Sequence, residues 1–200
     1  MTKINLVSFH GLYSQGDNLE DLVDRLKVEA ELNDIDIVTS QHDYPKLNMA
    51  MGYFRWSRDV VRDKILDCLS IEYYKHSDRK LVVLCHSNAT WGISRAIGKF
   101  YNDKDFIHDP INVSKIVLFG STIKRNYDWG RYPSIGVVNF VGTKDRVVWF
   151  SKFYKMGWSG RKGFKVKAPN LIEIVNPWRH SDFVLPENFE VIANEVLRGF

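Results

Sequence analysis

Cysteine is scarce in this chain of 200 residues, which has only Cys68 and Cys85. Two cysteines are too few for a disulfide scaffold or for a cysteine-rich zinc site. Long hydrophobic runs are also missing, because no apolar stretch approaches the roughly 20 residues that a membrane-spanning helix needs. The amino terminus lacks the basic start, the long apolar stretch and the small-residue cleavage site of a signal peptide. The sequence therefore predicts a cytoplasmic protein.

Several motifs of cofactor and metal chemistry are absent as well. The chain has no G-x-G-x-x-G after its first predicted strand, no G-x-x-x-x-G-K-[ST] and no H-E-x-x-H. These patterns are typical of dinucleotide, phosphate and zinc sites, so we expect neither a cofactor nor a catalytic metal ion. Cys68 falls in a predicted amphipathic helix and Cys85 in a predicted buried strand. Both are therefore interpreted as packing residues rather than thiol nucleophiles.

A strong excess of one charge is also lacking. The 28 lysines and arginines exceed the 24 acidic residues by only four. Nucleic-acid binding proteins usually have a concentrated basic face, and we expect no nucleic-acid partner here. The contents of hydrophobic residues (44%) and charged residues (26%) are near globular averages, which excludes a disordered or collagen-like chain. The length fits one α/β domain over residues 1–200, and no linker or internal repeat divides it.

Strand-like and helix-like patterns alternate along the whole chain. Short apolar runs predict strands at 4–9, 35–39, 80–85, 115–119, 136–141 and 171–175. Apolar residues at helical spacing, or helix-compatible stretches between the strands, predict helices at 17–31, 58–74, 89–101 and 187–197. Strands that alternate with helices form a mostly parallel sheet that is covered on both faces. The sequence therefore predicts an α/β fold with about six mostly parallel strands.

Reactive side chains follow several of these predicted strands. In an open parallel sheet, ligands and catalytic residues lie at the edge where the carboxyl ends of the strands meet. The residues found there are His10 and Gly11, then His86, Ser87 and Asn88, then Asp145 in the turn 142–145, and finally His180. A serine, a carboxylate and a histidine are thus expected at the same edge of the sheet.

Ser87 lies where a buried strand changes directly into a helix, in the segment LCHSNATWGISRAI. This placement resembles the nucleophile elbow of the α/β-hydrolase superfamily, whose pattern is G-x-S-x-G between a strand and a helix. Cys85 and Ala89 stand at the two glycine positions, so the match is degenerate. The alternative interpretation is that Ser87 only caps the helix that begins near Ala89.

Asp145 and His180 occupy the places where that superfamily has its acid and its base. Asp145 follows a predicted strand in FVGTKDRVV, and His180 lies in NPWRHSDF between the last predicted strand and the last helix. The chain order Ser, Asp, His is also the order of the superfamily. Asp182 and Asp128 are alternative partners for the histidine, but neither stands at a strand-to-turn edge as Asp145 does.

The resemblance also implies an oxyanion hole, which needs two N–H donors near the attacked carbonyl. One donor is expected to be the backbone N–H of Asn88, directly after the serine. The other is assigned to the backbone of Leu12, with His10 and Gly11 forming the His-Gly pair that is familiar in this superfamily. His86 is expected to pack against or position the elbow. By itself, the His-Gly pair is equally compatible with an ordinary turn at the end of a strand.

Taken together, the resemblance covers almost the whole chain and implies a three-layer sandwich with the strand order 2-1-3-4-5-6. Only about fifteen residues (121–135) separate the fourth and fifth strands, so a small protein without a large cap is expected. The implied activity is that of a cofactor-free serine hydrolase, similar to esterases, lipases or thioesterases, which cleaves a small carboxylic ester or thioester through an acyl-enzyme. One alternative is a catalytically inactive binding module of the same fold.

A second alternative is a basic interaction protein that uses residues 144–167, where lysine and arginine alternate with aromatic residues. Asp145 is the one acidic residue of this segment. The segment contains eight basic residues: Lys144, Arg146, Lys152, Lys155, Arg161, Lys162, Lys165 and Lys167. One interpretation is a helix with solvated charges, followed by a flexible turn at WSGRKGF. The other is a surface for an anionic or lipidic partner. The sequence gives no indication of the acyl group, of a second acyl acceptor or of the oligomeric state.

Overall fold

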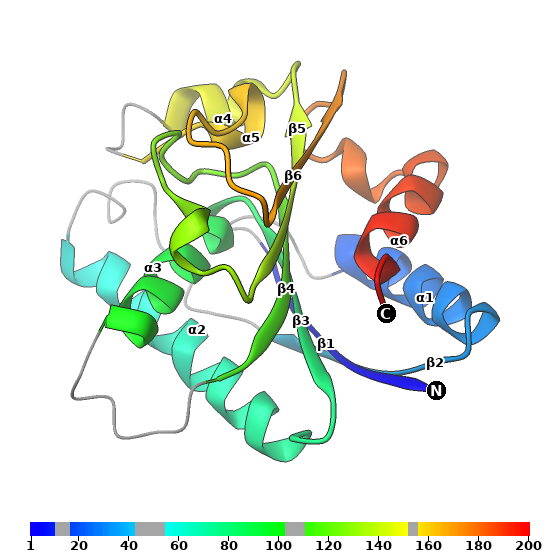
Figure 1. Cartoon of the computed structure of the whole chain (residues 1–200). Coiled ribbons are helices and arrows are strands. Elements are labelled where there is room, and N and C mark those ends of the chain that lie inside the picture. Colours follow the sequence, from blue (N-terminus) through cyan, green and yellow to red (C-terminus); the bar gives the residue numbers. More distant parts are fainter. Residues whose placement is uncertain (11–16, 43–54, 103–110, 152–155) are drawn as a thin grey trace.

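The computed structural model describes residues 1–10, 17–42, 55–102, 111–151 and 156–200 (Figure 1). Within these residues, six strands form one sheet in the order β2-β1-β3-β4-β5-β6, and every neighbouring pair is parallel. The strands are β1 (Thr2–Phe9), β2 (Ile35–His42), β3 (Lys80–His86), β4 (Val113–Phe119), β5 (Gly136–Gly142) and β6 (Leu171–Asn176). The strand number, direction and order predicted from the sequence are therefore confirmed.

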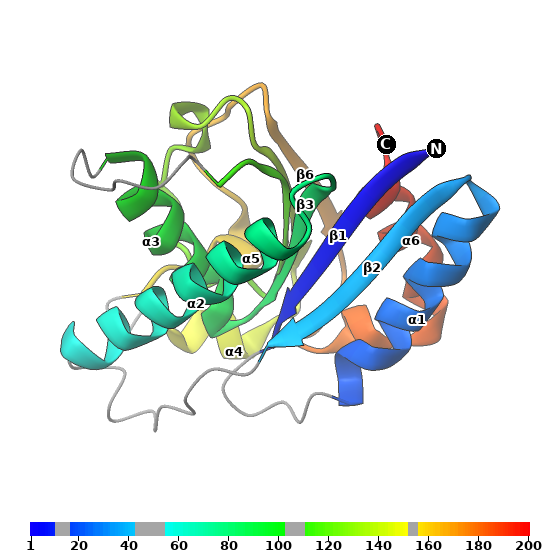
Figure 2. The same cartoon turned by 90° about the horizontal axis from the view of Figure 1, so that it is seen from below.

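Helices cover both faces of this sheet, so the predicted three layers are also confirmed. Figures 1 and 2 show α1 (Asp17–Leu32) and α6 (Phe189–Leu197) on one face. The other face carries α2 (Arg55–Lys75), α3 (Asn88–Asn102) and the short α5 (Ser159–Lys162). The six-residue α4 (Arg146–Ser151) follows β5 at the carboxyl edge. Among the described helices, none has the length and apolar character that a bilayer span requires.

The central strands are apolar because both of their faces are buried. In β3, Val83 and Cys85 pack into the hydrophobic cluster beneath α2 and α3. The alternate residues Val82 and Leu84 pack into the cluster beneath α1 and α6. Side chains of a strand point alternately to opposite faces, so one continuous apolar run supplies two separate cores.

Several element boundaries lie a few residues from the sequence-based expectation, and two of them have a clear physical reason. The strand predicted to end at Thr39 continues to His42, because β2 stays paired with β1 up to Phe9. The last helix begins at Phe189, since Pro186–Asn188 form a separate 3-10 turn before it. Proline lacks a backbone N–H and is suited to the first turn of such a segment.

The segment WSGRKGF, predicted to be a flexible turn, is instead a packed element. It contains α5, in which Ser159 and Gly160 are buried. The N–H of Gly160 donates to the carbonyl of Ser121 at 2.8 Å. A Cβ at position 160 would lie 2.1 Å from the backbone N of Ser121, so only glycine allows this close approach.

Candidate active site

The carboxyl ends of β3, β5 and β6 bring Ser87, Asp145 and His180 together. The His180 Nε2 atom lies 3.1 Å from the Ser87 hydroxyl oxygen. The other ring nitrogen, Nδ1, lies 2.8 Å from Asp145 Oδ2. These residues are 93 and 35 positions apart in the chain, and only the parallel sheet places them side by side.

Ser87 has a backbone conformation that is unusual for a residue with a side chain, with φ at 56°. Four hydrogen bonds hold it there. Its N–H donates to the carbonyl of Phe119 at 2.9 Å, and its own carbonyl accepts from the Thr90 N–H at 3.0 Å, the Thr90 hydroxyl at 2.5 Å and the Thr122 hydroxyl at 3.2 Å. Within the described residues, its hydroxyl pairs with His180 and not with a backbone N–H of α3. The capping interpretation therefore does not describe this side chain.

Asp145 is held in one orientation by contacts on both sides of its carboxylate. It is 1% exposed, and its Oδ1 accepts from the N–H of Val148 at 2.9 Å. Arg161 Nη1 in α5 donates to the Asp145 backbone carbonyl at 3.1 Å. An ionised carboxylate only accepts hydrogen bonds, so the proton between it and His180 is assigned to Nδ1. The Nε2 lone pair is then free to accept the serine proton.

The two alternative carboxylates have other partners. Asp182 Oδ2 accepts from the N–H of Arg179 at 2.8 Å. Asp128 Oδ1 accepts from the N–H of Gly130 at 2.9 Å. Asp145 is thus the carboxylate that contacts the ring of His180.

Gly120, which sequence reasoning missed, lies against the His180 ring at its Cε1 and Nδ1 atoms. It follows β4 directly and has φ at 53°, a conformation that favours glycine. A Cβ at this position would lie 2.7 Å from His180 Cε1 and 2.8 Å from Nδ1. The absence of a side chain therefore makes room for the imidazole. The available signal was a glycine placed immediately after the apolar run KIVLF.

The ring of His86 also contacts the ring of His180. Its ring centre lies 4.7 Å from that of His180 and 4.6 Å from that of Phe183. Burial holds the pKa of His86 well below its usual 6.5, and the nearby His180 and His10 lower it further. His86 is therefore neutral at pH 7 and places no second positive charge beside His180. His10, the other predicted supporting histidine, is buried at the end of β1.

One of the two predicted oxyanion donors lies within the described residues. Asn88 is the first residue of α3, where a backbone N–H has no partner inside the helix. Among the described residues, this N–H has no hydrogen-bond acceptor. Gly11 and Leu12, which were expected to shape the other donor, lie outside the described residues. The complete oxyanion hole thus stays a prediction.

The two cysteines are packing residues of the hydrophobic core. Cys68 and Cys85 are both buried, and burial raises the pKa of each thiol, which disfavours the reactive thiolate. In the part of the chain that the structure describes, no three His, Cys, Asp or Glu side chains gather in a way that would hold a metal ion.

Comparison with known proteins gives a likeness of structure and not of sequence. No protein-family model and no curated protein sequence matches the chain. Alpha/beta hydrolase domain-containing protein 10 from mouse aligns with a TM-score of 0.59 at 10% identity, over 96% of this chain and 87% of that chain. An esterase, Est2, from the Planctomycetes species Thermogutta terrifontis aligns with a TM-score of 0.55 at 14% identity, over 98% of this chain and 81% of that chain. The chain has the α/β-hydrolase fold.

Proposed function

We propose that the protein is a serine hydrolase that cleaves a carboxylic ester or thioester and needs no cofactor. The observation that carries this proposal is the pair of hydrogen bonds that links three distant residues. The Ser87 hydroxyl lies 3.1 Å from His180 Nε2, and Nδ1 of the same ring lies 2.8 Å from Asp145. Such a chain of contacts is the arrangement that turns a weak hydroxyl nucleophile into an effective one.

The proposed reaction has two halves, with a covalent intermediate between them. His180 removes the proton of Ser87 while the serine oxygen bonds to the substrate carbonyl carbon. Asp145 stabilises the imidazolium that forms, and the N–H of Asn88 stabilises the negative carbonyl oxygen together with the second donor predicted at Leu12. His180 then gives its proton to the departing alcohol or thiol. A water molecule, deprotonated by His180, attacks the acyl-serine, and the released proton returns to Ser87 as the acid leaves.

The structural relatives support a carboxylic ester as the substrate class. Est2 of Thermogutta terrifontis is described as an esterase, and it has also been solved with propionate bound. Propionate is a short carboxylate, the class of product that ester hydrolysis releases. We extend this substrate class to the present chain because the two share the fold and the chain carries the serine, acid and histidine described above.

The test of the proposed function is covalent labelling with a fluorophosphonate, which reacts with activated serines. We expect stoichiometric labelling of the native protein and none of Ser87→Ala. His180→Ala is expected to slow hydrolysis of short-chain p-nitrophenyl esters by roughly 10³-fold or more, because the base is lost. Ser70→Ala is a matched control, since this serine only bonds to a carbonyl within α2. Unchanged labelling of Ser87→Ala would show that Ser87 is not the reactive serine and would contradict the proposal. A native protein that neither labels nor turns over esters would favour the inactive binding module.

We further propose that an anionic or lipidic surface binds next to this site through residues 144–167. Val147 and Phe150 in α4 are 56% and 55% exposed, although both are apolar. Lys144 and Arg146 are exposed beside them. Apolar side chains flanked by cations suit the interface of a membrane that contains anionic lipid. Since α4 follows Asp145 directly, a substrate held in such a surface would be delivered close to the serine.

A further inference from the structure

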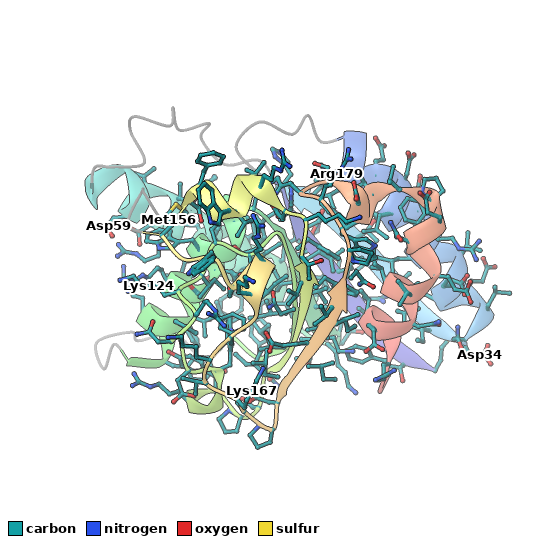
Figure 3. All side chains as sticks on the ribbon, turned by 90° about the horizontal axis from the view of Figure 1, so that it is seen from above. Asp34, Asp59, Lys124, Met156, Lys167 and Arg179 are labelled. Atoms are coloured by element: carbon teal, nitrogen blue, oxygen red, sulfur yellow. The ribbon has the colours of Figure 1, made fainter. Side chains whose placement is uncertain are left out.

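A cavity of about 240 Å³ lies between α3 and the segment that connects β4 to β5. None of Ser87, Asp145 and His180 lines it. Figure 3 shows Lys124, which lines the cavity, toward one edge of the molecule and apart from Arg179, the neighbour of His180 in the chain. Its principal lining side chains are Trp91, Arg95, Lys124, Tyr127, Arg131 and Tyr132.

The charges around this cavity are unbalanced. Arg95, Lys124 and Arg131 are basic, whereas Asp128 is the one acidic residue of the lining. Asp128 is occupied, because its carboxylate bonds to the N–H of Gly130 and lies 3.7 Å from Arg131 Nε. Among the described residues, neither Arg95 nor Lys124 has an ion-pair partner. Two cationic side chains therefore border a hollow without a compensating carboxylate.

Rigid aromatic rings form the walls. Trp91 is 7% exposed and Tyr132 is 4% exposed, so both rings are fixed by the surrounding core. The Tyr127 hydroxyl donates to the carbonyl of Ser94 at 2.8 Å, which fixes the third ring. Burial raises the pKa of Tyr127, so its hydroxyl stays neutral and does not offset the cations. The Arg95 guanidinium lies 5.5 Å from the centre of the Trp91 ring.

We propose that this cavity is a second binding site, which takes a compact ligand with one planar ring and one phosphate or carboxylate group. The ring would pack among Trp91, Tyr127 and Tyr132, and the anionic group would bind Arg95 and Lys124. Arginine pairs with both kinds of anion through parallel hydrogen bonds. The cavity is smaller than the ~300–1,000 Å³ typical of pockets for larger ligands, which is why a single ring is the size that fits.

The test is calorimetric titration of the full chain with phenyl phosphate at low salt, with phenol and inorganic phosphate as reference ligands. We expect saturable binding of phenyl phosphate that is tighter than that of either reference. Arg95→Gln and Lys124→Gln should each weaken it, and the double variant should weaken it by roughly tenfold or more, since hydrogen bonds to charged groups are lost. Lys64→Gln is the matched control, because Lys64 is exposed on α2 and lines no part of the cavity.

Ser87→Ala separates this site from the proposed active site. We expect this variant to bind phenyl phosphate as tightly as the native protein, whether or not the protein hydrolyses esters. Loss of binding in Ser87→Ala would assign the ligand to the catalytic centre and overturn the proposal. Equal binding of phenol and phenyl phosphate, or equal weakening by Lys64→Gln, would also overturn it. If inorganic phosphate bound as tightly as phenyl phosphate, the aromatic walls would play no part and the proposed ligand class would be wrong.

Discussion

The backbone of Ser87 is strained, and this strain orients its side chain at the candidate site. A non-glycine residue at a φ of 56° costs on the order of 1–3 kcal/mol, and the fold must supply that energy elsewhere. Local hydrogen bonds offset this strain, because Phe119, Thr90 and Thr122 all hydrogen-bond to the backbone of Ser87. The strained turn directs the hydroxyl toward His180, above the edge of the sheet. Strain at this residue is therefore part of the geometry on which the proposed reaction depends.

At the same scale, Gly120→Ala is expected to reduce kcat/KM for a soluble ester by roughly 10²-fold. The added Cβ would lie 2.7 Å from His180 Cε1, so the ring must move, and a displacement of about 1 Å is enough for a loss of this size. The matched control is Gly98→Ala in α3, where the nearest atom lies 3.6 Å away. Steady-state kinetics and circular dichroism of both variants give the comparison. Native activity in Gly120→Ala would show that the glycine does not position the histidine.

At the scale of elements, the segment that contains α5 and the segment after β4 form one backbone-paired unit. Gly157 donates to the Thr122 carbonyl at 2.7 Å, and Arg125 Nε donates to the Gly163 carbonyl at 2.8 Å. A Cβ at Gly157 would lie 1.9 Å from the carbonyl oxygen of Ile123, so the approach depends on glycine. This unit supports the site, because one segment contains Gly120, which lies beside His180, and the other contains Arg161, which hydrogen-bonds to the Asp145 carbonyl. It also contacts β5, where the Asn139 side-chain amide donates to the Ser159 carbonyl at 3.2 Å.

The surface of α4 leads to the next prediction. The double variant Val147→Ser/Phe150→Ser should lose roughly tenfold of its activity on an ester embedded in vesicles that contain phosphatidylglycerol. The reason is that two apolar side chains no longer enter the lipid, while activity on a soluble ester should stay unchanged. Val28→Ser/Leu32→Ser in α1 is the matched control, since these side chains are also exposed, at 48% and 74%, but lie on another part of the molecule. Equal losses in both double variants would remove α4 as the docking element.

At the scale of the whole molecule, Lys115 joins the middle of the sheet to the carboxyl-terminal end of α6. It is a β4 residue that is only 9% exposed. Its Nζ donates to the carbonyls of Val196 at 2.8 Å and Arg198 at 2.6 Å, and lies 4.5 Å from the centre of the Phe200 ring. The last carbonyls of a helix have no partner within it, so the buried ammonium satisfies them and fixes the helix against the sheet.

The stability of the protein should therefore depend on Lys115 in alkaline solution. Burial lowers the pKa of Lys115 from 10.5 to about 8. Between these two values the unfolded chain holds one proton more than the folded chain, so this group makes the protein more stable as the pH rises through that range. We expect the difference in unfolding free energy between the native protein and Lys115→Met to increase from pH 8 to pH 10.5, as measured by urea denaturation. Lys165→Met, at an exposed lysine, should show no such trend. A flat or falling difference for Lys115→Met would contradict the lowered pKa.

The sequence by itself determined the order of the elements and the parallel sheet, because hydrophobic periodicity is a local property of the chain. It also placed Ser87, Asp145 and His180 after the right strands, and a parallel sheet brings the ends of such strands to one edge. Only the tertiary structure decided that Gly120 borders the imidazole, that Arg161 holds the backbone of Asp145, and that WSGRKGF is packed instead of flexible. These features arise from contacts between segments that are distant in the chain. A local sequence pattern does not predict which distant segments will come into contact. The aromatic and cationic cavity beside α3 has the same origin, since its walls come from two segments whose proximity is set by the packing of the whole sheet.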